Sequence, residues 1–401
     1  MAKREPRAPL PVVVVEGGHA ALGRAMGRAQ ARPIQRVVEA TLRTLHEQGT
    51  TEAQLREQNA PYVEAAESIF PELMLELREM ARAAEVPFDV LFRLNCYEAR
   101  PPGTPVPPLG VQAGSAGPSQ PLPHVPGAGG ELVVAGGAGE ARERATPGGA
   151  PAGGGCTTVI SAGDAGVVVG HTEDSWPEAI EGLYLLEATV TEPHAAAGVA
   201  RSRFLALNYA QSLPGCAAAA NEHGLHVLID ALPDPDRRIG APRHFLSRAL
   251  LDVPSIEAAL DLLQSVRRGG GWNFLLVQGT RAVNVETTAT RMAITEVEPG
   301  GTYAHTNHYR DPLLAAAVGE PRPNSLARLT RALELVRPGM SLNEMKQLLA
   351  DRQGFPDSIC RDRTIGAFVA DTARGEIEVC WGEPDDAVWT RHRVQATGPL
   401  G

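Results

Sequence analysis

A Gly- and Pro-rich segment divides this 401-residue sequence into two parts of different character. Between Pro101 and Gly155, 26 of 55 residues are Gly or Pro. A segment of this composition buries too little apolar surface to fold by itself, so we expect a linker at residues 101–155. The fold must then be assembled from a region at 1–100 and a region at 156–401. For residues 101–145 the alternative is an insertion without a function of its own.

The first hundred residues carry apolar side chains at helical spacing, which predicts a mostly helical block. Pro33 is expected to break or kink the first helical stretch. Further helices are predicted after Thr51, from about Pro61 to Ala84, and from about Pro87.

Beyond residue 156, short β-rich runs separated by turn signals predict strands. These runs lie at 183–190, 201–208, 215–221, 225–230, 273–278, 282–286, 292–297 and 303–306, with a final hairpin at 364–371 and 376–381. Helices are expected among them at about 242–251, 255–266, 325–336 and 342–349. Strands in runs, with helices grouped between them, indicate layered α+β packing rather than a parallel βαβ fold.

The linker ends at Cys156, which opens a β-branched run at 156–160. A second run at 166–171 follows a Gly/Asp turn, so the two runs predict a hairpin that holds the thiol on a rigid strand. Gly155 has no Cβ, which leaves room for the Cys156 thiol to attack the preceding carbonyl. Cleavage there would leave a new N-terminus that carries both a thiol nucleophile and an α-amine, which titrates at about 7.7 to 8.0. The alternative is a buried structural cysteine.

Composition excludes several classes of partner. The formal net charge is -10, which argues against nucleic acid and anionic membranes because phosphate binding needs concentrated Lys and Arg. The five cysteines are odd in number and lack CxxC spacing, so neither a disulfide framework nor a zinc site is indicated. No apolar run approaches the ~20 residues that span a bilayer. We expect a soluble, cytoplasmic protein.

Several polar residues close the predicted strands and could serve acyl-transfer chemistry. Asp174 ends the hairpin and could orient the new α-amine, although Asp is also common as a turn residue. Asn221 and Asn273 could donate to an oxyanion, or could be turn residues. Two HxxH pairs give metal-dependent hydrolysis as an alternative; they are His223 with His226 and His305 with His308.

Several motifs, in their order and spacing, resemble the acyl-coenzyme A:6-aminopenicillanic acid (isopenicillin-N) N-acyltransferase family. The central ones are Gly154-Gly155-Cys156-Thr157-Thr158 and Gly170-His171-Thr172-Glu173-Asp174, which ends 18 residues after the cysteine. The others are Asn221-Glu222-His223-Gly224-Leu225, Asn273-Phe274, Thr306-Asn307-His308-Tyr309, and the early Gly18-His19 with Gly23 and Gly27. The resemblance covers most of the chain except residues 101–152.

This resemblance implies an α+β fold, the four-layer αββα sandwich of N-terminal-nucleophile hydrolases, with the mostly helical N-terminal block as an α-chain. By match, the precursor is cut between Gly155 and Cys156, which becomes the nucleophile, and its freed amine becomes the base. Asp174 would hold the amine, and Asn273 with the backbone near Asn221 would form the oxyanion hole. Arg328 resembles the arginine that supports the nucleophile in related choloylglycine hydrolases. The predicted substrate contacts are Glu173, Trp176 and His308.

The sequence therefore predicts an autoprocessed cysteine amidohydrolase or acyltransferase that acts on a small-molecule or small-peptide amide through an acyl-Cys156 thioester. We expect no cofactor and no metal, with acyl-coenzyme A as a candidate substrate. The expected partner is the chain's own cleaved α-chain, in a heterodimer, with no nucleic acid or membrane partner. The alternative from another class is an uncleaved, inactive binding module of the same fold.

Overall fold

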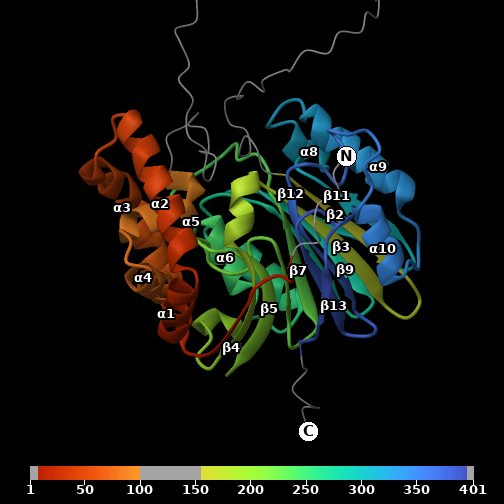
Figure 1. Cartoon of the computed structure of the whole chain (residues 1–401), viewed down its shortest axis with the longest axis horizontal. Coiled ribbons are helices and arrows are strands. Elements are labelled where there is room, and N and C mark those ends of the chain that lie inside the picture. Colours follow the sequence, from red (N-terminus) through yellow and green to blue (C-terminus); the bar gives the residue numbers. More distant parts are fainter. Residues whose placement is uncertain (1–7, 100–154, 395–401) are drawn as a thin grey trace, which may run out of the picture.

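Two β-sheets packed face to face form the centre of the computed structural model, which describes residues 8–99 and 155–394 (Figure 1). The larger sheet has the order β1 (Val12–Gly17), β4 (Leu183–Val190), β5 (Ser202–Tyr209), β6 (Ala218–Asn221), β7 (Leu225–Asp230), β8 (Asn273–Gln278), β9 (Arg281–Thr287), β10 (Met292–Glu296). The smaller sheet has the order β11 (Thr302–His305), β2 (Gly155–Ala162), β3 (Val167–Asp174), β12 (Thr364–Asp371), β13 (Glu376–Trp381), β14 (Trp389–His392). Neighbouring strands are antiparallel except for β1 and β4, which are parallel.

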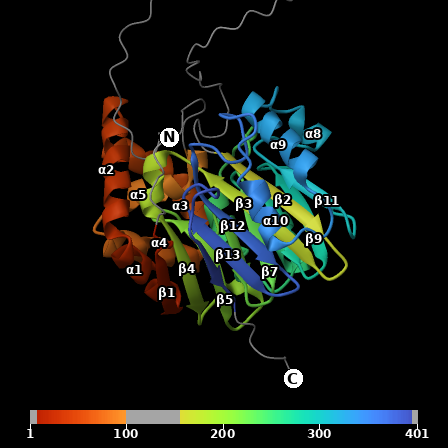
Figure 2. The same cartoon turned by 45° about the vertical axis from the view of Figure 1, so that its right-hand side comes forward.

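Helices cover the outer face of each sheet (Figures 1 and 2). The larger sheet packs against α1 (His19–Ala29), α2 (Ala31–Glu47), α3 (Glu52–Ile69), α4 (Pro71–Ala83), α5 (Phe88–Asn95), α6 (Arg243–Ala249) and α7 (Ile256–Ser265). The smaller sheet packs against α9 (Pro323–Leu335) and α10 (Leu342–Leu349), with the short α8 (Pro312–Ala315) beside them. Within the described residues, three short 3-10 helices complete the elements: η1 (Tyr97–Ala99), η2 (Pro177–Gly182) and η3 (Ala195–Ala197).

The inner strands of the larger sheet, β4 to β9, are buried on both faces, which explains their continuous apolar runs. In β5, Leu205 and Leu207 pack between the sheets, whereas Phe204 and Ala206 pack against the helices. Successive side chains of a strand point to opposite faces, so one strand serves two hydrophobic cores. The predicted α+β class, its four αββα layers and the helical N-terminal block are confirmed.

Most predicted elements after residue 156 match the structure to within a few residues, and β4, β7, β8 and α10 match in full. The predicted helix from Pro61 to Ala84 was wrong. Pro61 lies inside α3, and a new helix starts at Pro71, which occupies the first helical position where a missing N–H costs nothing. Pro33 lies in the first turn of α2, and the break falls at Gln30. The predicted linker lies outside the described residues except for Gly155.

Sequence reasoning missed several elements, among them the short α8 and β14, and it also missed strand β1. It joins the edge of the larger sheet beside β4, and its side chains alternate between exposed and half-buried positions. A uniform run of valines hides that alternation in the sequence. Through β1 and the helices, residues before the linker share one core with strands that follow it.

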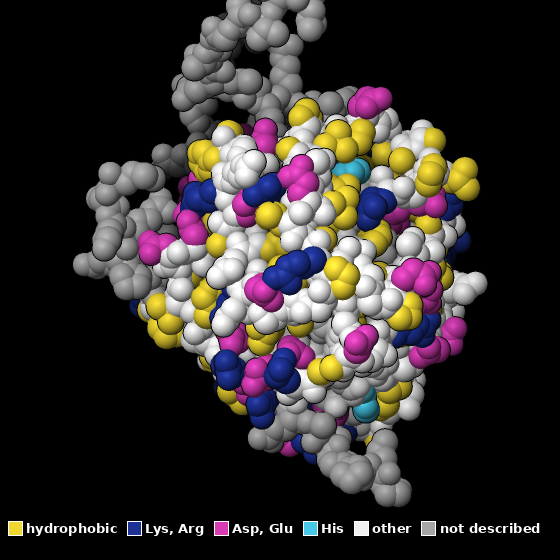
Figure 3. All heavy atoms as spheres, turned by 90° about the vertical axis from the view of Figure 1, so that its right-hand side faces the viewer, with side chains coloured by type: hydrophobic (Ala, Val, Ile, Leu, Met, Phe, Trp, Pro, Cys, Tyr) yellow, Lys and Arg dark blue, Asp and Glu magenta, His cyan; other side chains and the backbone are white. Residues whose placement is uncertain are grey.

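The outer surface carries charges of both signs. On the face in Figure 3, which lies at the right in Figure 1, basic and acidic side chains are intermixed and hydrophobic ones are scattered. Ion pairs such as Arg331 with Asp351, at 2.8 Å, join α9 to the loop after α10. Within the two described ranges, every helix is too short or too polar to cross a bilayer.

Helices α1 and α4 cross so closely that two glycines are required. A Cβ on Gly23 would lie 2.0 Å from the carbonyl oxygen of Glu76, and one on Gly27 would lie 2.4 Å from that of Met80. The carboxylate of Glu76 is fully buried beneath this crossing, where it accepts from Arg248 Nε at 3.2 Å and lies 2.8 Å from His19 Nδ1. The crossing therefore positions a buried charge that ties α1 and α4 to α6.

We expect Glu76→Gln to lower the free energy of unfolding by about 3 kcal/mol at neutral pH, because it leaves the buried Arg248 short of one carboxylate. Burial alone would raise the pKa of Glu76, but the Arg248 charge and the His19 hydrogen bond outweigh it and lower that pKa below 4.5. Its stabilisation is therefore present above about pH 4.5 and is lost as the pH falls through the folded-state pKa. The variant should lose less stability than the wild type on acidification.

Urea unfolding at neutral pH and at about pH 4 measures both effects. Glu67→Gln, in an exposed ion pair that joins α3 to Arg78 of α4, is the matched control and should change little. Equal losses in the two variants would contradict the proposed importance of the buried charge.

Candidate active site

The β2–β3 hairpin carries the cysteine at its open end, in the middle of the smaller sheet. In the antiparallel register, Cys156 lies opposite Glu173, and Gly155 lies opposite Asp174. The strand begins at Gly155, one residue before its predicted start at Cys156. The nucleophile candidate is thus fixed by a central strand that is hydrogen-bonded on both sides.

The two faces of β2 meet different layers. Thr158, on the same face as Cys156, donates to Asp230 Oδ1 of the larger sheet at 3.0 Å. Thr157, on the opposite face, accepts from Arg328 Nη1 of α9 at 2.9 Å. The Cys156 thiol therefore points between the sheets, while its neighbours point toward the outer helices.

Polar side chains hold the backbone of Cys156 at both ends. Its N–H donates to Asn307 Oδ1 at 3.0 Å, and its carbonyl oxygen accepts from Arg328 Nη1. Arg328 Nη2 also donates to Asn307 Oδ1, at 2.7 Å, which closes the arrangement. A Cβ on Gly155 would lie 2.5 Å from Arg361 Nη2 and 3.1 Å from Asn307 Oδ1. A larger residue before Cys156 would have to displace the Arg361 guanidinium.

The thiol belongs to a buried cluster of polar groups. Cys156 Sγ lies 3.7 Å from Glu173 Oε2, which lies 2.9 Å from His171 Nε2. Tyr209, on β5 of the other sheet, donates to Glu173 Oε1 at 2.7 Å. The ring of His171 is oriented by Thr158, whose Oγ1 lies 2.9 Å from Nδ1.

Burial, followed by the nearby carboxylates of Glu173, Asp230 and Asp174, raises the pKa of Cys156 well above its usual range. The thiol is therefore protonated at neutral pH and needs a base to become a nucleophile. Burial also raises the pKa of Glu173, against the lowering effect of His171.

Asp174 is buried on the outer face of the sheet. Its Oδ2 accepts from Arg361 Nε at 2.7 Å, and its Oδ1 accepts from Thr364 Oγ1 at 2.7 Å. Because Arg361 also approaches Gly155, Asp174 reaches the predicted cleavage junction through this guanidinium.

Of the two predicted oxyanion residues, Asn273 lies near the cluster around Cys156 and Asn221 does not. Asn273 starts β8 opposite Asp230, and its Nδ2 donates to Asp230 Oδ2 at 3.3 Å. Its buried Oδ1 has no hydrogen-bond partner among the described residues. Asn221 is the last residue of β6, at the opposite end of β7 from Asp230, and its Nδ2 donates to the carbonyls of Leu251 and Val253. The structure does not bring Asn221 to Cys156, because the length of β7 separates them.

The three predicted substrate contacts lie in three different settings. Glu173 is part of the thiol cluster itself. Trp176 follows β3 and is half-buried, with the Arg363 guanidinium 4.4 Å from its ring centroid. His308 Nδ1 lies 2.8 Å from Ser325 Oγ at the start of α9, and burial lowers the pKa of this imidazole to about 4.

Sequence reasoning missed several groups around the cysteine: Asn307 as a contact, and Tyr209, Asp230 and Arg361 altogether. Asn307 lies in a motif that carried the family resemblance. Asp230 left a weaker signal, since it is a charged residue that closes an apolar run. For Tyr209 and Arg361 we find no signal in the sequence.

The residues that could bind a metal ion differ from the histidine pairs suggested by the sequence. Within the described residues, Cys156, His171 and Glu173 form a group whose ligand atoms all lie within 4.8 Å of one another. The HxxH histidines are not part of this group. His305 lies between Asp230 and Glu286, and His226 Nδ1 lies 3.1 Å from the carbonyl oxygen of Gly224.

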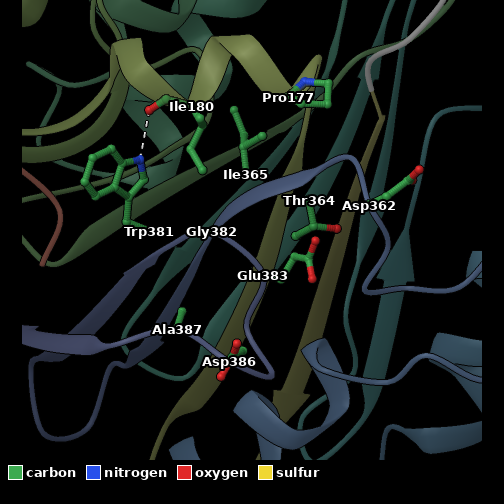
Figure 4. Close-up of a pocket in the computed structure, with 10 residues that line it drawn as sticks. All are labelled: Pro177, Ile180, Asp362, Thr364, Ile365, Trp381, Gly382, Glu383, Asp386 and Ala387. Carbon is green, nitrogen blue, oxygen red and sulfur yellow. Dashed lines mark hydrogen bonds between the residues drawn. The ribbon is translucent and has the colours of Figure 1, made fainter. Parts of the chain in front are cut away.

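A pocket of about 220 Å³ lies beside this site, at the end of β12 and β13 (Figure 4). Its lining includes Thr364, which donates to Asp174. Apolar side chains and carboxylates share the lining, among them Ile180, Ile365, Trp381, Asp362, Glu383 and Asp386. Such a mixture suits a ligand with an apolar body and a cationic group.

The αββα sandwich and the cysteine near the start of a central strand define the class of N-terminal-nucleophile hydrolases. Residues 161–386 match the acyl-coenzyme A:6-aminopenicillanic acid acyl-transferase family, beginning five residues after Cys156. Because the match spans more than half of the chain, this protein belongs to that family. It is therefore an amidohydrolase or acyltransferase of the N-terminal-nucleophile type.

The chain is also similar to individual proteins. The β-alanyl-dopamine/carcinine hydrolase of Drosophila melanogaster is 26% identical over 407 residues, which cover 95% of each chain. The Caenorhabditis elegans ortholog of N-acylethanolamine-hydrolyzing acid amidase is 13% identical, with a TM-score of 0.40 over 54% of this chain and 93% of that one. A mutant conjugated bile acid hydrolase from Clostridium perfringens is 11% identical, with a TM-score of 0.32 over 60% and 98%.

We expect Arg328→Lys to lower the rate of amide turnover by roughly 100-fold, because one ammonium cannot hold both the Cys156 carbonyl and Asn307 in place. Turnover is measured with the amide that the wild type cleaves fastest. Arg331→Lys, on the same helix but paired with Asp351 away from the cysteine, is the control and should retain the wild-type rate. Similar rates for both variants would rule out this positioning role.

Proposed function

We propose that this protein cleaves its own chain before Cys156 and then hydrolyses small amides through an acyl-Cys156 thioester. The observation that carries the proposal is the double restraint on the Cys156 backbone by Asn307 and Arg328, with a protonated thiol directly beside it. A thiol without a preformed thiolate needs a base, and a freed α-amine on the same residue would supply one.

In the proposed first step, Cys156 Sγ attacks the Gly155 carbonyl carbon, and Glu173 accepts the thiol proton. The guanidinium groups of Arg361 and Arg328 lie beside Gly155 and favour the negative charge that develops on its carbonyl oxygen. The C–N bond then breaks, the Cys156 nitrogen takes a proton, and a thioester remains. Water hydrolyses this thioester, which leaves a carboxylate on Gly155 and a free thiol and amine on Cys156.

In the proposed catalytic cycle, the α-amine accepts the thiol proton as Sγ attacks the substrate carbonyl. Asn307 Oδ1, which accepts from the Cys156 N–H in the uncleaved chain, would orient this amine, and Asp174 would act through Arg361. Asn273 is the proposed oxyanion donor, since its Nδ2 uses one of two hydrogens on Asp230. The leaving amine takes the proton, and water then resolves the thioester; an amine in place of water would give acyl transfer.

The substrate we propose is an amide with a cationic acyl part and an aromatic or apolar amine part. Two observations support this class: the pocket beside Asp174 combines Trp381 and Ile365 with acidic side chains, and the similar Drosophila protein is named for hydrolysing β-alanyl-dopamine and carcinine. A β-alanyl group is cationic at neutral pH because its amine is protonated.

The self-cleavage proposal predicts two fragments in the intact mass spectrum of the purified wild type, one beginning with Cys156. Cys156→Ala should remain a single chain without amidase activity, because it has no nucleophile. Cys156→Ser should cleave slowly, since a hydroxyl is a weaker nucleophile in the same geometry. Cys96→Ala removes a buried thiol among the N-terminal helices and should cleave normally. A wild-type chain that stays intact and is fully active would overturn the proposal.

The substrate proposal predicts that Asp362→Asn raises the KM for a β-alanyl amide by about 10-fold, through loss of one charge-assisted contact. The KM for the acetyl amide of the same amine should not change, because that substrate has no cation. Asp385→Asn is the matched control, since Asp385 pairs with Arg352 and does not line the pocket. Equal changes for the two amides would contradict recognition of the cation in this pocket.

A further inference from the structure

We propose that Cys156, His171 and Glu173 form a binding site for a thiophilic divalent cation such as Zn²⁺, and that the bound metal inhibits the enzyme. The site is not a catalytic metal centre in this proposal, since the metal would occupy the nucleophile. The binding itself follows from the geometry of the uncleaved chain and does not depend on the proposed function; the inhibition does.

The spacing of the three donor atoms fits one tetrahedral ion. With Zn–S at about 2.3 Å and Zn–N or Zn–O at about 2.0 to 2.1 Å, adjacent ligand atoms are separated by roughly 3.3 to 3.6 Å. Cys156 Sγ and Glu173 Oε2 are 3.7 Å apart, and all three donor atoms lie within 4.8 Å of one another. His171 Nε2 and Glu173 Oε2, at 2.9 Å, would move apart by a few tenths of an ångström as the ion replaces their hydrogen bond.

The β2–β3 register preorganises these donors. Glu173 lies directly opposite Cys156, and His171 lies two residues before Glu173 on the same face of β3. A cross-strand pair plus an i, i+2 neighbour places three side chains side by side on one face of the sheet. No rearrangement of the backbone is needed to bring them together.

Outer hydrogen bonds already hold two of the ligands in the required orientation. Thr158 Oγ1 is hydrogen-bonded to His171 Nδ1 and itself donates to Asp230. Because Nδ1 is held in this way, the other ring nitrogen, Nε2, faces Cys156 and Glu173. Tyr209 occupies Glu173 Oε1, which leaves Oε2 for the ion. Metal sites in proteins use this kind of second layer to fix ring orientation and ligand basicity.

The donor set selects the metal. A thiolate, an imidazole and one carboxylate favour Zn²⁺ or Co²⁺ over Mg²⁺ and Ca²⁺, which prefer all-oxygen ligands. Binding releases two protons: the thiol proton, which leaves as the Zn–S bond forms, and the proton of the hydrogen bond between His171 and Glu173, which the ion replaces. If the chain is cleaved as proposed above, the freed α-amine of Cys156 can join its own sulfur as a fourth ligand in a five-membered chelate ring. Sulfur and amine would then both be withheld from substrate.

The test uses the purified full chain after treatment with a chelator. Titration with Co²⁺ should produce a thiolate-to-cobalt charge-transfer band with one equivalent, and Zn²⁺ should abolish that band by competition. Cys156→Ser should lose the band, and His171→Gln should weaken binding by more than the roughly 10- to 100-fold that loss of an outer hydrogen bond costs. His226→Gln, a buried histidine held by a backbone carbonyl elsewhere, is the matched control and should bind as the wild type does. Circular dichroism confirms that each variant is folded.

Zn²⁺ should inhibit amide turnover over the same concentration range in which it binds, and chelator should restore the rate in full. Binding without a thiolate band, or binding that survives both Cys156→Ser and His171→Gln, would overturn the proposal. The absence of any binding or inhibition at millimolar Zn²⁺ or Co²⁺ would also overturn it. The outcomes separate the two proposals. An intact chain that shows the cobalt band would support the metal site and contradict self-cleavage. A cleaved, active enzyme whose rate does not change with zinc would support self-cleavage and contradict the metal site.

Discussion

A hydrogen bond between the two sheets, from the Thr158 hydroxyl to Asp230, is the contact on which the site depends. The same hydroxyl oxygen lies 2.9 Å from His171 Nδ1, and His171 in turn holds Glu173 beside the thiol. Polar groups buried between two apolar sheets are costly unless each one is paired. The sheets can therefore pack in the one relative position that satisfies these partners, and that position sets where Cys156 points.

The hydrogen-bond network that contains Thr158 and Asp230 also includes His305, which faces the Asp230 carboxylate. His305 lies between Asp230 and Glu286, and Glu286 also accepts the backbone N–H groups of Arg310 and Asp311. Burial by itself would lower the pKa of His305, but its hydrogen bonds to the two carboxylates raise it overall. A charged imidazole between two acids makes this buried arrangement tolerable. The histidine that the sequence offered as a metal ligand is thus a counter-ion in the support of the site.

How far the sequence could predict the fold depended on the element. Strands such as β7 and β8 were predicted to the residue, because an apolar run bounded by turn signals is a local property. The helix boundary near Pro71 was misplaced, since Pro61 and Pro71 carry the same local signal and packing decides which one starts a helix. Strand β1 was missed because its pairing with β4, 173 residues later, leaves no local pattern.

Local composition and periodicity were enough to predict the cysteine at a glycine junction, the hairpin that carries it, and the layered α+β class. The polar groups that surround the cysteine could be identified only from the packed arrangement of the two sheets. Tyr209, Asn307 and Arg361 come from separate segments and meet Cys156 or its immediate neighbours through the packing of two sheets and a helix. Asn221, which looked equivalent to Asn273 in sequence, is carried to the far end of β7. Strand direction and length, which place a residue at one end of a sheet or the other, are not encoded in the residue's own neighbourhood.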